Sequence, residues 1–322
     1  MSLRVQIIAV ALALAVAARL LRAQKLRSNA IPPASERVVI LGASTVNGIG
    51  AAIAAKALAR GVRQIMLVGR NAQGLREVKE HLSASAGCSA SIVIHAADCT
   101  RDADVLATRD TVVAEFGGVD TLHIVFGSIV DETLLGAAGA DPIRQDGGAV
   151  TSDGLANVHA AMDASCTLNV TGTALVLAAF IPLLQTSSRH PHVGVIGSLA
   201  SLIPAPTRAL YAAVKSAQQQ LVLGVATECT SQAKIPGNSH VKFTVFAPGS
   251  VATSFSTTEA RASAIPPSKV ADTVIRAIDH GHTGVIPIPH KYFAAWMLSI
   301  FWCVSADSPN MIERSAHAKY GY

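Results

Sequence analysis

The sequence predicts an α/β fold, a doubly wound parallel sheet of about seven strands in a single domain. Short apolar runs rich in Val and Ile alternate with helix-length segments from residue 37 onward. Such runs are typical of parallel strands whose two faces are both covered by helices. The composition agrees, since 50% of the residues are hydrophobic and only 4% are aromatic. The predicted strands are residues 37–41, 64–68, 91–95, 121–126, 192–196, 241–246 and 284–288.

The segments between these strands carry helix signals. Residues 48–60 end at Gly61, and a glycine commonly terminates a helix. Residues 270–278 place an apolar side chain at every fourth position after two prolines, as in an amphipathic helix. The stretch between Gly127 and Asn169 is long and rich in Gly and Ala, so we expect a surface insertion before a helix.

The N-terminus predicts a membrane anchor over residues 1–22. Residues 5–21 are apolar except for Gln6 and Arg19. A helix of this length reaches about 26 Å, near the short limit for spanning a bilayer. More basic residues follow the segment than precede it, which favours a single-pass protein with a cytosolic domain. A cleaved signal peptide is the alternative, because residues 15–17 resemble a cleavage site.

The rest of the chain divides into three predicted parts. Residues 23–36 contain two prolines and are predicted as a linker, followed by the α/β domain over 37–290 and an apolar extension over 291–322. Within the extension, residues 292–303 are too few to span a bilayer. With two tryptophans they could lie in the membrane interface, or they could pack on the domain or on the partner subunit of a homodimer.

Charge and cysteine usage exclude several kinds of site. The formal net charge of +5 suits an anionic cofactor or a membrane surface. No cluster of basic and aromatic residues stands out, so we expect no nucleic-acid binding. The five cysteines are scattered without metal-ligand spacing, so we expect neither a metal site nor a disulfide framework.

A glycine-rich turn follows the first predicted strand and opens the next helix. Gly42, Gly48 and Gly50 would let the backbone turn tightly and approach a pyrophosphate, whose charge the helix N-terminus stabilises. This position predicts a Rossmann-type dinucleotide site in which Ser44 and Ile49 also bind the cofactor. A tight turn without a ligand is the alternative.

The residues after the second and third strands bear on the choice of cofactor. An acidic residue after the second strand would bind the ribose 2′-hydroxyl of NAD. Arg70 occupies this region instead, and its guanidinium suits the 2′-phosphate of NADP, although it could also be an ordinary solvated residue. We therefore expect NADP(H). Asp98 could bind the adenine amino group or cap the following helix.

Tyr211 and Lys215 are the predicted centre of the chemistry. Four residues apart on a helix, they share one face, and a nearby cation should lower the pKa of Tyr211 from about 10. Such a tyrosine can exchange a proton with a carbonyl or alcohol oxygen while hydride moves to or from nicotinamide. Ser198, with Ser201 as the alternative, follows the strand 192–196 and would hold the substrate oxygen. On its own, such a Tyr–Lys pair is more often a surface pair.

These motifs resemble the short-chain dehydrogenase/reductase family over residues 37–290. Three features depart from the family pattern, and one of them is the long interval between Gly127 and Asn169. Five residues, not three, separate Gly42 from Gly48, and residues 124–127 are Ile-Val-Phe-Gly where the family has Asn-Asn-Ala-Gly. Besides the glycine turn and Asp98, the matching segments are FGGVDTL at 116–122, LNVTG at 168–172, GSLAS at 197–201, YAAVK at 211–215 and APGSVATSF at 247–255.

The resemblance implies further roles for individual residues. Asn169 would be the fourth catalytic residue and would position a water in a proton relay through Lys215. Lys215 would also bind the nicotinamide ribose, and Val251 and Thr253 would contact the carboxamide and phosphate side of the cofactor. The other expected cofactor-binding residues are Gly127, Pro248 and Gly249.

In organisation the chain is similar to membrane-bound lipid-metabolising members, the 11-beta-hydroxysteroid dehydrogenase type and the 3-ketodihydrosphingosine reductases. This implies an NADP(H)-dependent oxidoreductase of the endoplasmic reticulum membrane that interconverts a carbonyl and an alcohol on a steroid, retinoid or long-chain lipid. Two other functions stay open. The altered glycine turn favours an NADP-binding sensor or scaffold with little turnover. A nucleotide-sugar epimerase also uses Tyr-x-x-x-Lys, but a substantial C-terminal substrate domain is missing.

Overall fold

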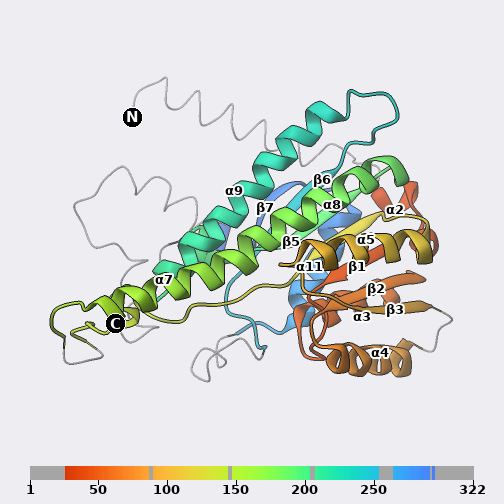
Figure 1. Ribbon diagram of the computed structural model, residues 1–322. Coiled ribbons are helices and arrows are strands. Elements are labelled where there is room, and N and C mark those ends of the chain that lie inside the picture. Colours follow the sequence, from red (N-terminus) through yellow and green to blue (C-terminus); the bar gives the residue numbers. More distant parts are fainter. Residues whose placement is uncertain are drawn as a thin grey trace, which may run out of the picture.

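The computed structural model describes residues 26–86, 90–143, 147–203, 207–253, 264–290 and 292–293. In this part of the chain, seven strands form one parallel sheet in the order β3-β2-β1-β4-β5-β6-β7 (Figure 1). The predicted seven-stranded parallel sheet in a single domain is confirmed, and every predicted strand end lies within two residues of the observed one. The strands are β1 Arg37–Leu41, β2 Gln64–Gly69, β3 Ser91–Ala96, β4 Thr121–Ile124, β5 His192–Ile196, β6 Lys242–Pro248 and β7 Gly284–Ile288.

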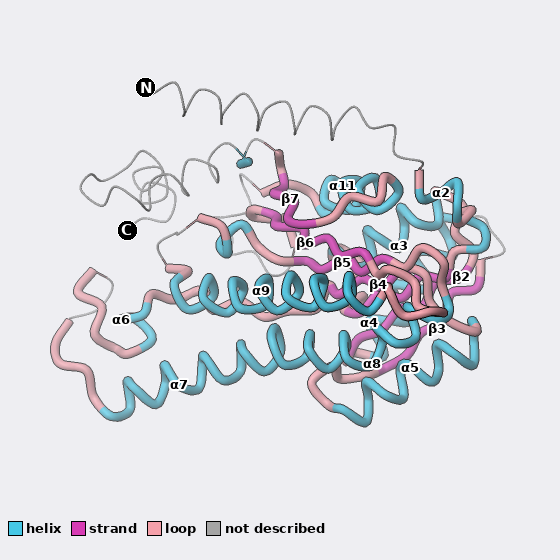
Figure 2. The backbone as a smooth tube through the Cα atoms, turned by 90° about the horizontal axis from the view of Figure 1, so that it is seen from above, coloured by secondary structure: helices cyan, strands magenta, loops and turns pink. Residues whose placement is uncertain are grey.

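Two helical layers cover the sheet, as Figure 2 shows for α3 and α11 on one side of the strands and α5 and α8 on the other. Strand side chains alternate between the two layers. On β1, Val38 and Ile40 pack into the first layer, while Val39 and Leu41 pack into the second. The layers consist of α3 Ile49–Ala59, α4 Ala72–Ala86 and α11 Pro267–Asp279 on one face, and α5 Asp102–Phe116, α8 Gly172–Ser187 and α9 Ala209–Gln232 on the other.

The predicted surface insertion contains two helices. They are α6, Leu134–Ala137, and α7, Ser152–Cys166, and α7 continues through the π-helical turn η2, Thr167–Thr171, into α8 (Figure 1). Among the described residues, this continuous helix, Ser152–Ser187, has the length and mean hydropathy, 1.8, that could cross a bilayer. Its α8 half buries Val176, Phe180 and Leu184 against the sheet, so we assign it to the protein core.

The described part of the predicted linker, residues 26–36, packs on the domain. It forms α2, Arg27–Ala30, and the short helical turn η1, Pro33–Ser35. Arg27 is only 6% exposed. Its guanidinium donates to the carbonyl of His190 at 2.7 Å and pairs with the carboxylate of Glu36 at 2.6 Å. These bonds hold the segment against the domain, so residues 26–36 pack on the domain and do not separate it from the preceding residues as a linker would.

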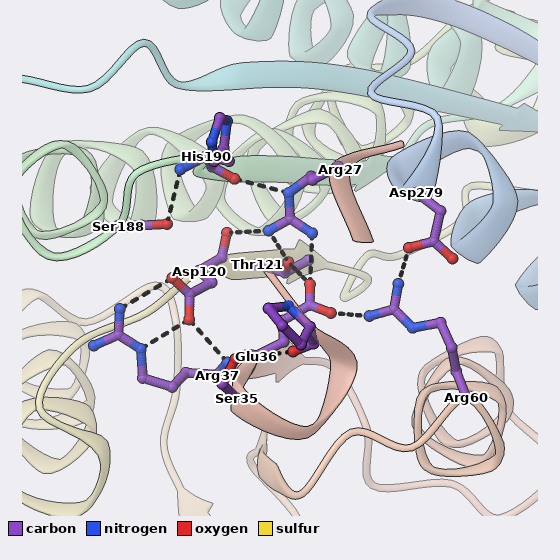
Figure 3. A network of polar contacts seen from close by, with 11 residues as sticks. Arg27, Ser35, Glu36, Arg37, Arg60, Asp120, Thr121, Ser188, His190 and Asp279 are labelled. Atoms are coloured by element: carbon purple, nitrogen blue, oxygen red, sulfur yellow. Dashed lines mark hydrogen bonds and ion pairs between the residues drawn. The ribbon is translucent and has the colours of Figure 1, made fainter. Parts of the chain in front are cut away.

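We call Arg27, Glu36, Arg60 and Asp279 the N-terminal clasp (Figure 3). Arg60, from the end of α3, pairs with both Glu36 and Asp279. The clasp lies beside Thr121, the first residue of β4, and therefore at the N-terminal edge of the sheet. The predicted anchor over residues 1–22 lies outside the described residues, as does the extension over 291–322 apart from residues 292–293.

Two histidines are buried in the central strands. His123 of β4 lies beside Gly194, and Nε2 of His192 on β5 lies 2.9 Å from Oγ1 of Thr244. Burial lowers the pKa of His123 to about 3 and moves the pKa of His192 well below its ordinary value. Nearby cations, among them Arg27, lower both pKa values further. Both rings therefore stay neutral inside the sheet at physiological pH.

We expect acid to destabilise the fold through these rings. A histidine in the unfolded chain titrates near pH 6.5. Between pH 6.5 and about 3, His123 therefore binds a proton in the unfolded chain and does not bind one in the folded protein. The free energy of unfolding therefore decreases as the pH falls below 6.5. The decrease is ~1.4 kcal/mol for each pH unit and for each of the two histidines.

Urea unfolding at several pH values between 7 and 5 gives the free energy of unfolding as a function of pH. This free energy should change less with pH in His123→Gln than in the wild type, and as much as in the wild type in the exposed His159→Gln. The same change with pH in all three proteins would contradict the expectation.

Candidate active site

The four predicted catalytic residues converge at the C-terminal edge of the sheet. Ser198 follows β5 and lies close enough to Tyr211 to lower the pKa of the phenol. On the same helix as Tyr211, Lys215 donates from Nζ to the carbonyl of Ile196, the last residue of β5, at 3.2 Å. A Cβ added to Gly127 would lie 2.8 Å from Oδ1 of Asn169 and 3.3 Å from Nζ of Lys215. Gly127 therefore lets Asn169 and Lys215 approach the chain that follows β4.

The structure places the two candidate serines differently. Ser198 caps the short helical turn η3, Leu199–Ser201, by accepting from the backbone of Ala200 at 3.1 Å, and it also contacts Tyr211. The hydroxyl of Ser201 instead points toward two other acceptors, the carbonyl of Ser198 at 2.7 Å and Oε1 of Gln219 at 3.0 Å. Ser198 is therefore the serine that can share a substrate oxygen with Tyr211.

Asn169 lies in the π-helical turn η2 and is fully buried. Its Nδ2 donates to the carbonyl of Ser165 at 2.9 Å and to the hydroxyl of Ser128 at 3.1 Å. The side chain thus joins the long helix to the chain after β4. Its backbone carbonyl accepts from the hydroxyl of Thr173 at 2.6 Å.

The electrostatics at Tyr211 differ from the expectation that Lys215 lowers its pKa. Burial raises the pKa of Tyr211 above its ordinary value, and the hydrogen bond with Ser198 and the charge of Arg208 offset only part of this rise. Burial also lowers the pKa of Lys215 to about 7. The predicted depression was wrong because helix spacing shows that two residues share a face, but does not show how deeply the protein buries them.

Arg208 is a residue of the site that sequence reasoning missed. It precedes the first turn of α9, three residues before Tyr211, and pairs with Asp131 at 2.6 Å. The pair joins the start of α9 to the chain after β4. A cation one turn from Tyr211 was a signal in the sequence, but its orientation depends on Asp131, which lies 77 positions earlier.

The glycine turn has the close backbone packing that a dinucleotide site needs. Gly42 has a φ of 99°, and an added Cβ would lie 2.4 Å from the backbone nitrogen of Phe126. An added Cβ at Gly50 would lie 2.5 Å from the carbonyl oxygen of Gly42. At the start of α3, Gly48 provides no side-chain cap, which suits an anion at this helix N-terminus. These residues fit the pyrophosphate of an NAD(P) cofactor.

The glycine turn and the residues after β4, the two short departures from the family pattern, are accommodated locally. The lengthened glycine turn closes on itself through a bond from the backbone of Gly48 to the carbonyl of Thr45 at 2.9 Å. After β4, the backbones of Val125 and Phe126 both donate to the carbonyl of Leu41, and the Phe126 ring packs in the core layer of α5 and α8. The apolar residues therefore extend the core instead of opening a gap beside the cofactor site.

Gly74 is a second residue that the sequence did not reveal. It lies in α4, and an added Cβ there would come within 2.2 Å of the carbonyl oxygen of Ser44. The glycine turn therefore packs directly on the first turn of α4, where Asn71 accepts from the backbone of Gly74 at 3.0 Å. A single glycine within a helix carries no local signal for this contact.

Arg70 and Asp98 lie near each other beyond the ends of β2 and β3. Nη1 of Arg70 is 3.9 Å from Oδ2 of Asp98, and the Arg70 side chain is 67% exposed. Asp98 accepts from the backbone and hydroxyl of Thr100 at 3.0 and 2.8 Å, so it caps the turn before α5. Burial acts to raise the pKa of Asp98, but the bonds from Thr100 and the charges of Arg70 and Arg101 outweigh it and lower that pKa.

The predicted Pro-Gly turn follows β6. The backbone of Gly249 donates to the carbonyl of Ile288 at 2.9 Å, and Val251 pairs with Ile265 in an isolated bridge. The Val251 side chain is buried in the layer of α3 and α11. Thr253 donates from its backbone to the carbonyl of Val251 at 2.8 Å. Pro248 ends β6, so the turn lies at the same sheet edge as Ser198.

Comparison with known proteins shows which family the chain belongs to. Residues 36–264 match the model of the short chain dehydrogenase family. An uncharacterized oxidoreductase of Staphylococcus epidermidis is 28% identical over 243 residues, which cover 74% of this chain and 89% of the relative.

Two solved structures have the same fold. A metagenomic short-chain oxidoreductase in complex with NADP is 26% identical, with a TM-score of 0.58 over 79% of this chain and 96% of its own. A short chain dehydrogenase/reductase from Burkholderia phymatum in complex with NAD is 18% identical, with a TM-score of 0.67 over 85% and 96%. The chain therefore belongs to the short-chain dehydrogenase/reductase family of NAD(P)-dependent oxidoreductases that interconvert carbonyls and alcohols.

Proposed function

We propose that the protein is an NADP(H)-dependent reductase of a lipophilic ketone or aldehyde, and that it works at the endoplasmic reticulum membrane with its catalytic domain in the cytosol. The observation that carries the chemistry is the placement of Ser198 beside Tyr211, with the buried Lys215 one turn further along the same helix. The membrane and the lipid substrate rest on the apolar sequences of residues 5–21 and 292–303.

In reduction, Tyr211 donates the proton of its phenol to the carbonyl oxygen of the substrate. Ser198 hydrogen-bonds to the same oxygen and stabilises the charge that develops on it. Bound NADPH supplies the hydride. Burial raises the pKa of Tyr211 above its ordinary value, so the phenol is protonated at neutral pH and available as a proton donor. Lys215, with a pKa of about 7, can return a proton to the site under the same conditions.

The preference for NADP(H) is supported by Arg70. Its exposed guanidinium lies after β2, where an acidic residue would instead bind the ribose of NAD. No acidic residue occurs within residues 64–71.

We expect Arg70→Ala to weaken NADPH binding by roughly 10- to 100-fold, because a hydrogen bond to a charged group contributes about 1.5–3 kcal/mol. NADH binding should change little. Fluorescence titration with both nucleotides measures the two dissociation constants. Arg101→Ala, which removes another exposed arginine near Asp98, serves as the matched control. Equal losses for NADPH and NADH in Arg70→Ala would remove the support for an NADP preference.

The substrate class is tested by NADPH oxidation with the full-length chain in detergent. The panel contains steroid ketones, retinal and long-chain ketones, with short water-soluble ketones for comparison. We expect kcat/KM to rise with the apolar surface of the substrate. Higher values for the short ketones would contradict a lipid substrate. NADPH binding without turnover of any carbonyl would favour the sensor or scaffold function.

The proposed orientation is tested separately by protease protection in microsomes. A catalytic domain in the cytosol should be digested by protease added outside the vesicles. Protection of the domain until detergent is added would contradict the cytosolic assignment.

A further inference from the structure

A line of hydrogen-bonded groups connects Lys215 with the backbone of Asn169 behind the active site. Nζ of Lys215 donates to Oε1 of Gln218 at 2.8 Å. Nε2 of Gln218 donates to the hydroxyl of Thr173 at 2.8 Å, and that hydroxyl donates to the carbonyl of Asn169 at 2.6 Å. All four residues are buried, and Gln218 is only 1% exposed. We call them the buried polar line.

Only one orientation of the Gln218 amide satisfies the buried polar line. In its charged form lysine has donors and no acceptor, so the amide oxygen of Gln218 must face the Lys215 ammonium. The amide nitrogen then faces Thr173, whose hydroxyl accepts this bond and directs its own hydrogen to the carbonyl of Asn169, a group that can only accept. A flipped amide would oppose donor to donor at Lys215. The Lys215 ammonium at one end and the Asn169 carbonyl at the other therefore require the same direction for every bond in the line.

In the part of the chain that the structure describes, the surroundings of Lys215 contain few groups that could replace Gln218. On its own helix, α9, the facing titratable group is Tyr211, and Arg208 lies one turn further toward the helix start. The long helix offers the uncharged Asn169 and Thr173, β5 offers the carbonyl of Ile196, and Gly127 follows β4. The two acceptors bonded to Nζ are the carbonyl of Ile196 and the amide oxygen of Gln218.

We propose that Gln218 is a positioning residue that holds the Lys215 ammonium between β5 and the π-helical turn and couples it to the backbone of Asn169. A buried amide and a buried hydroxyl are costly unless they are hydrogen-bonded, and here both are bonded at both ends. The inference deepens the proposed function, in which Lys215 supplies protons to Tyr211. Because Gln218 is placed to stabilise the charged form of Lys215, it also influences the pH at which Lys215 titrates.

The test measures Lys215 directly, without substrate or cofactor. The full-length chain in detergent, with lysine isotope-labelled at the ε carbon, is titrated by NMR, and Lys215→Arg identifies the Lys215 signal. Gln218→Leu removes the acceptor, so we expect the titration midpoint of Lys215 to fall by about one pH unit. Gln218→Glu places a carboxylate beside the ammonium, so the midpoint should rise by about one pH unit or more.

The same helix offers a matched control. Gln220→Leu makes the same chemical change two residues further along α9, where the side chain is exposed, and should leave the Lys215 midpoint at its wild-type value. An unchanged midpoint in Gln218→Leu, or an equal shift in Gln220→Leu, would overturn the proposal.

A second pair of variants tests the line if Gln218→Leu does not fold. Thr173→Val removes the acceptor of the Gln218 amide, and Thr173→Ser keeps the hydroxyl. We expect the midpoint to fall in Thr173→Val, by less than in Gln218→Leu, and to stay near the wild-type value in Thr173→Ser. Equal midpoints in both variants would count against the proposal.

Activity provides a separate readout once a substrate is known. The pH at which kcat changes should move in the same direction as the NMR midpoint in Gln218→Leu and Gln218→Glu. If the midpoints shift and no carbonyl is reduced by the wild-type protein, the positioning role stands and the proposed function fails. If carbonyls are reduced and the midpoints are unchanged, the proposed function stands and the positioning role fails.

Discussion

Replacing Tyr211 by Phe is expected to lower turnover by about 10²–10⁴-fold, the contribution usual for a general acid or base. The variant loses the phenol hydroxyl that lies beside Ser198 and would protonate the substrate oxygen, but it keeps the aromatic ring. Single-turnover rates of NADPH oxidation with the best carbonyl of the panel measure the loss. NADPH affinity and the thermal unfolding midpoint should stay close to those of the wild type.

The two neighbouring serines provide the control for this mechanism. Ser198→Ala removes the other group on the substrate oxygen and should also lower the rate strongly. Ser201→Ala removes a hydroxyl bonded to the carbonyl of Ser198 and to Gln219, so its effect should be much smaller. A Tyr211→Phe protein with the wild-type rate would exclude the proposed proton transfer.

Removing the carboxylate of Glu36 is expected to lower the free energy of unfolding by about 3–5 kcal/mol, the range found when a buried ion pair loses one partner. Glu36 is 1% exposed and pairs with both Arg27 and Arg60. Burial already lowers the pKa of each of these arginines to about 10. Glu36→Ala would leave two guanidinium groups close together without the anion between them. Urea unfolding at pH 7 measures the change.

An exposed ion pair on the same face provides the comparison. Lys56 of α3 pairs with Asp272 of α11 at 2.8 Å, but the two side chains are 41% and 44% exposed. Lys56→Ala should therefore cost no more than about 1 kcal/mol. If Glu36→Ala and Lys56→Ala lost the same stability, the N-terminal clasp would contribute no more than a surface pair.

The clasp also shows why part of the domain boundary could not be predicted. Residues 23–36 contain prolines and no long apolar run, so their local pattern is that of a linker. Arg27 reaches partners at Asp120, Thr121 and His190, which lie 93 or more positions further along the chain. Hydrophobic periodicity reports which face of an element is buried, and it contains no information on an ion pair between distant segments.

The candidate site could likewise be predicted only where it depends on local sequence patterns. Ser198, Tyr211 and Lys215 were predictable because strand ends and helix spacing are local properties, and the parallel sheet brings its strand ends to one edge. Asn169 came from the resemblance to the family. The choice of Ser198 over Ser201 required the folded turn, because both residues lie within five positions of the strand end.

The sequence by itself determined the sheet, the helices that cover it, the dinucleotide turn and the Tyr–Lys pair, since each depends on residues a few positions apart. Only the tertiary structure decided the ionisation of that pair. Burial raises the pKa of Tyr211 and lowers that of Lys215, whereas helix spacing alone predicted an easily ionised tyrosine. Likewise Arg208 acts on Tyr211, and Gln218 reaches Thr173, through contacts made when separate elements pack together. Burial and such contacts belong to the whole fold, because they depend on which segments exclude water from one another.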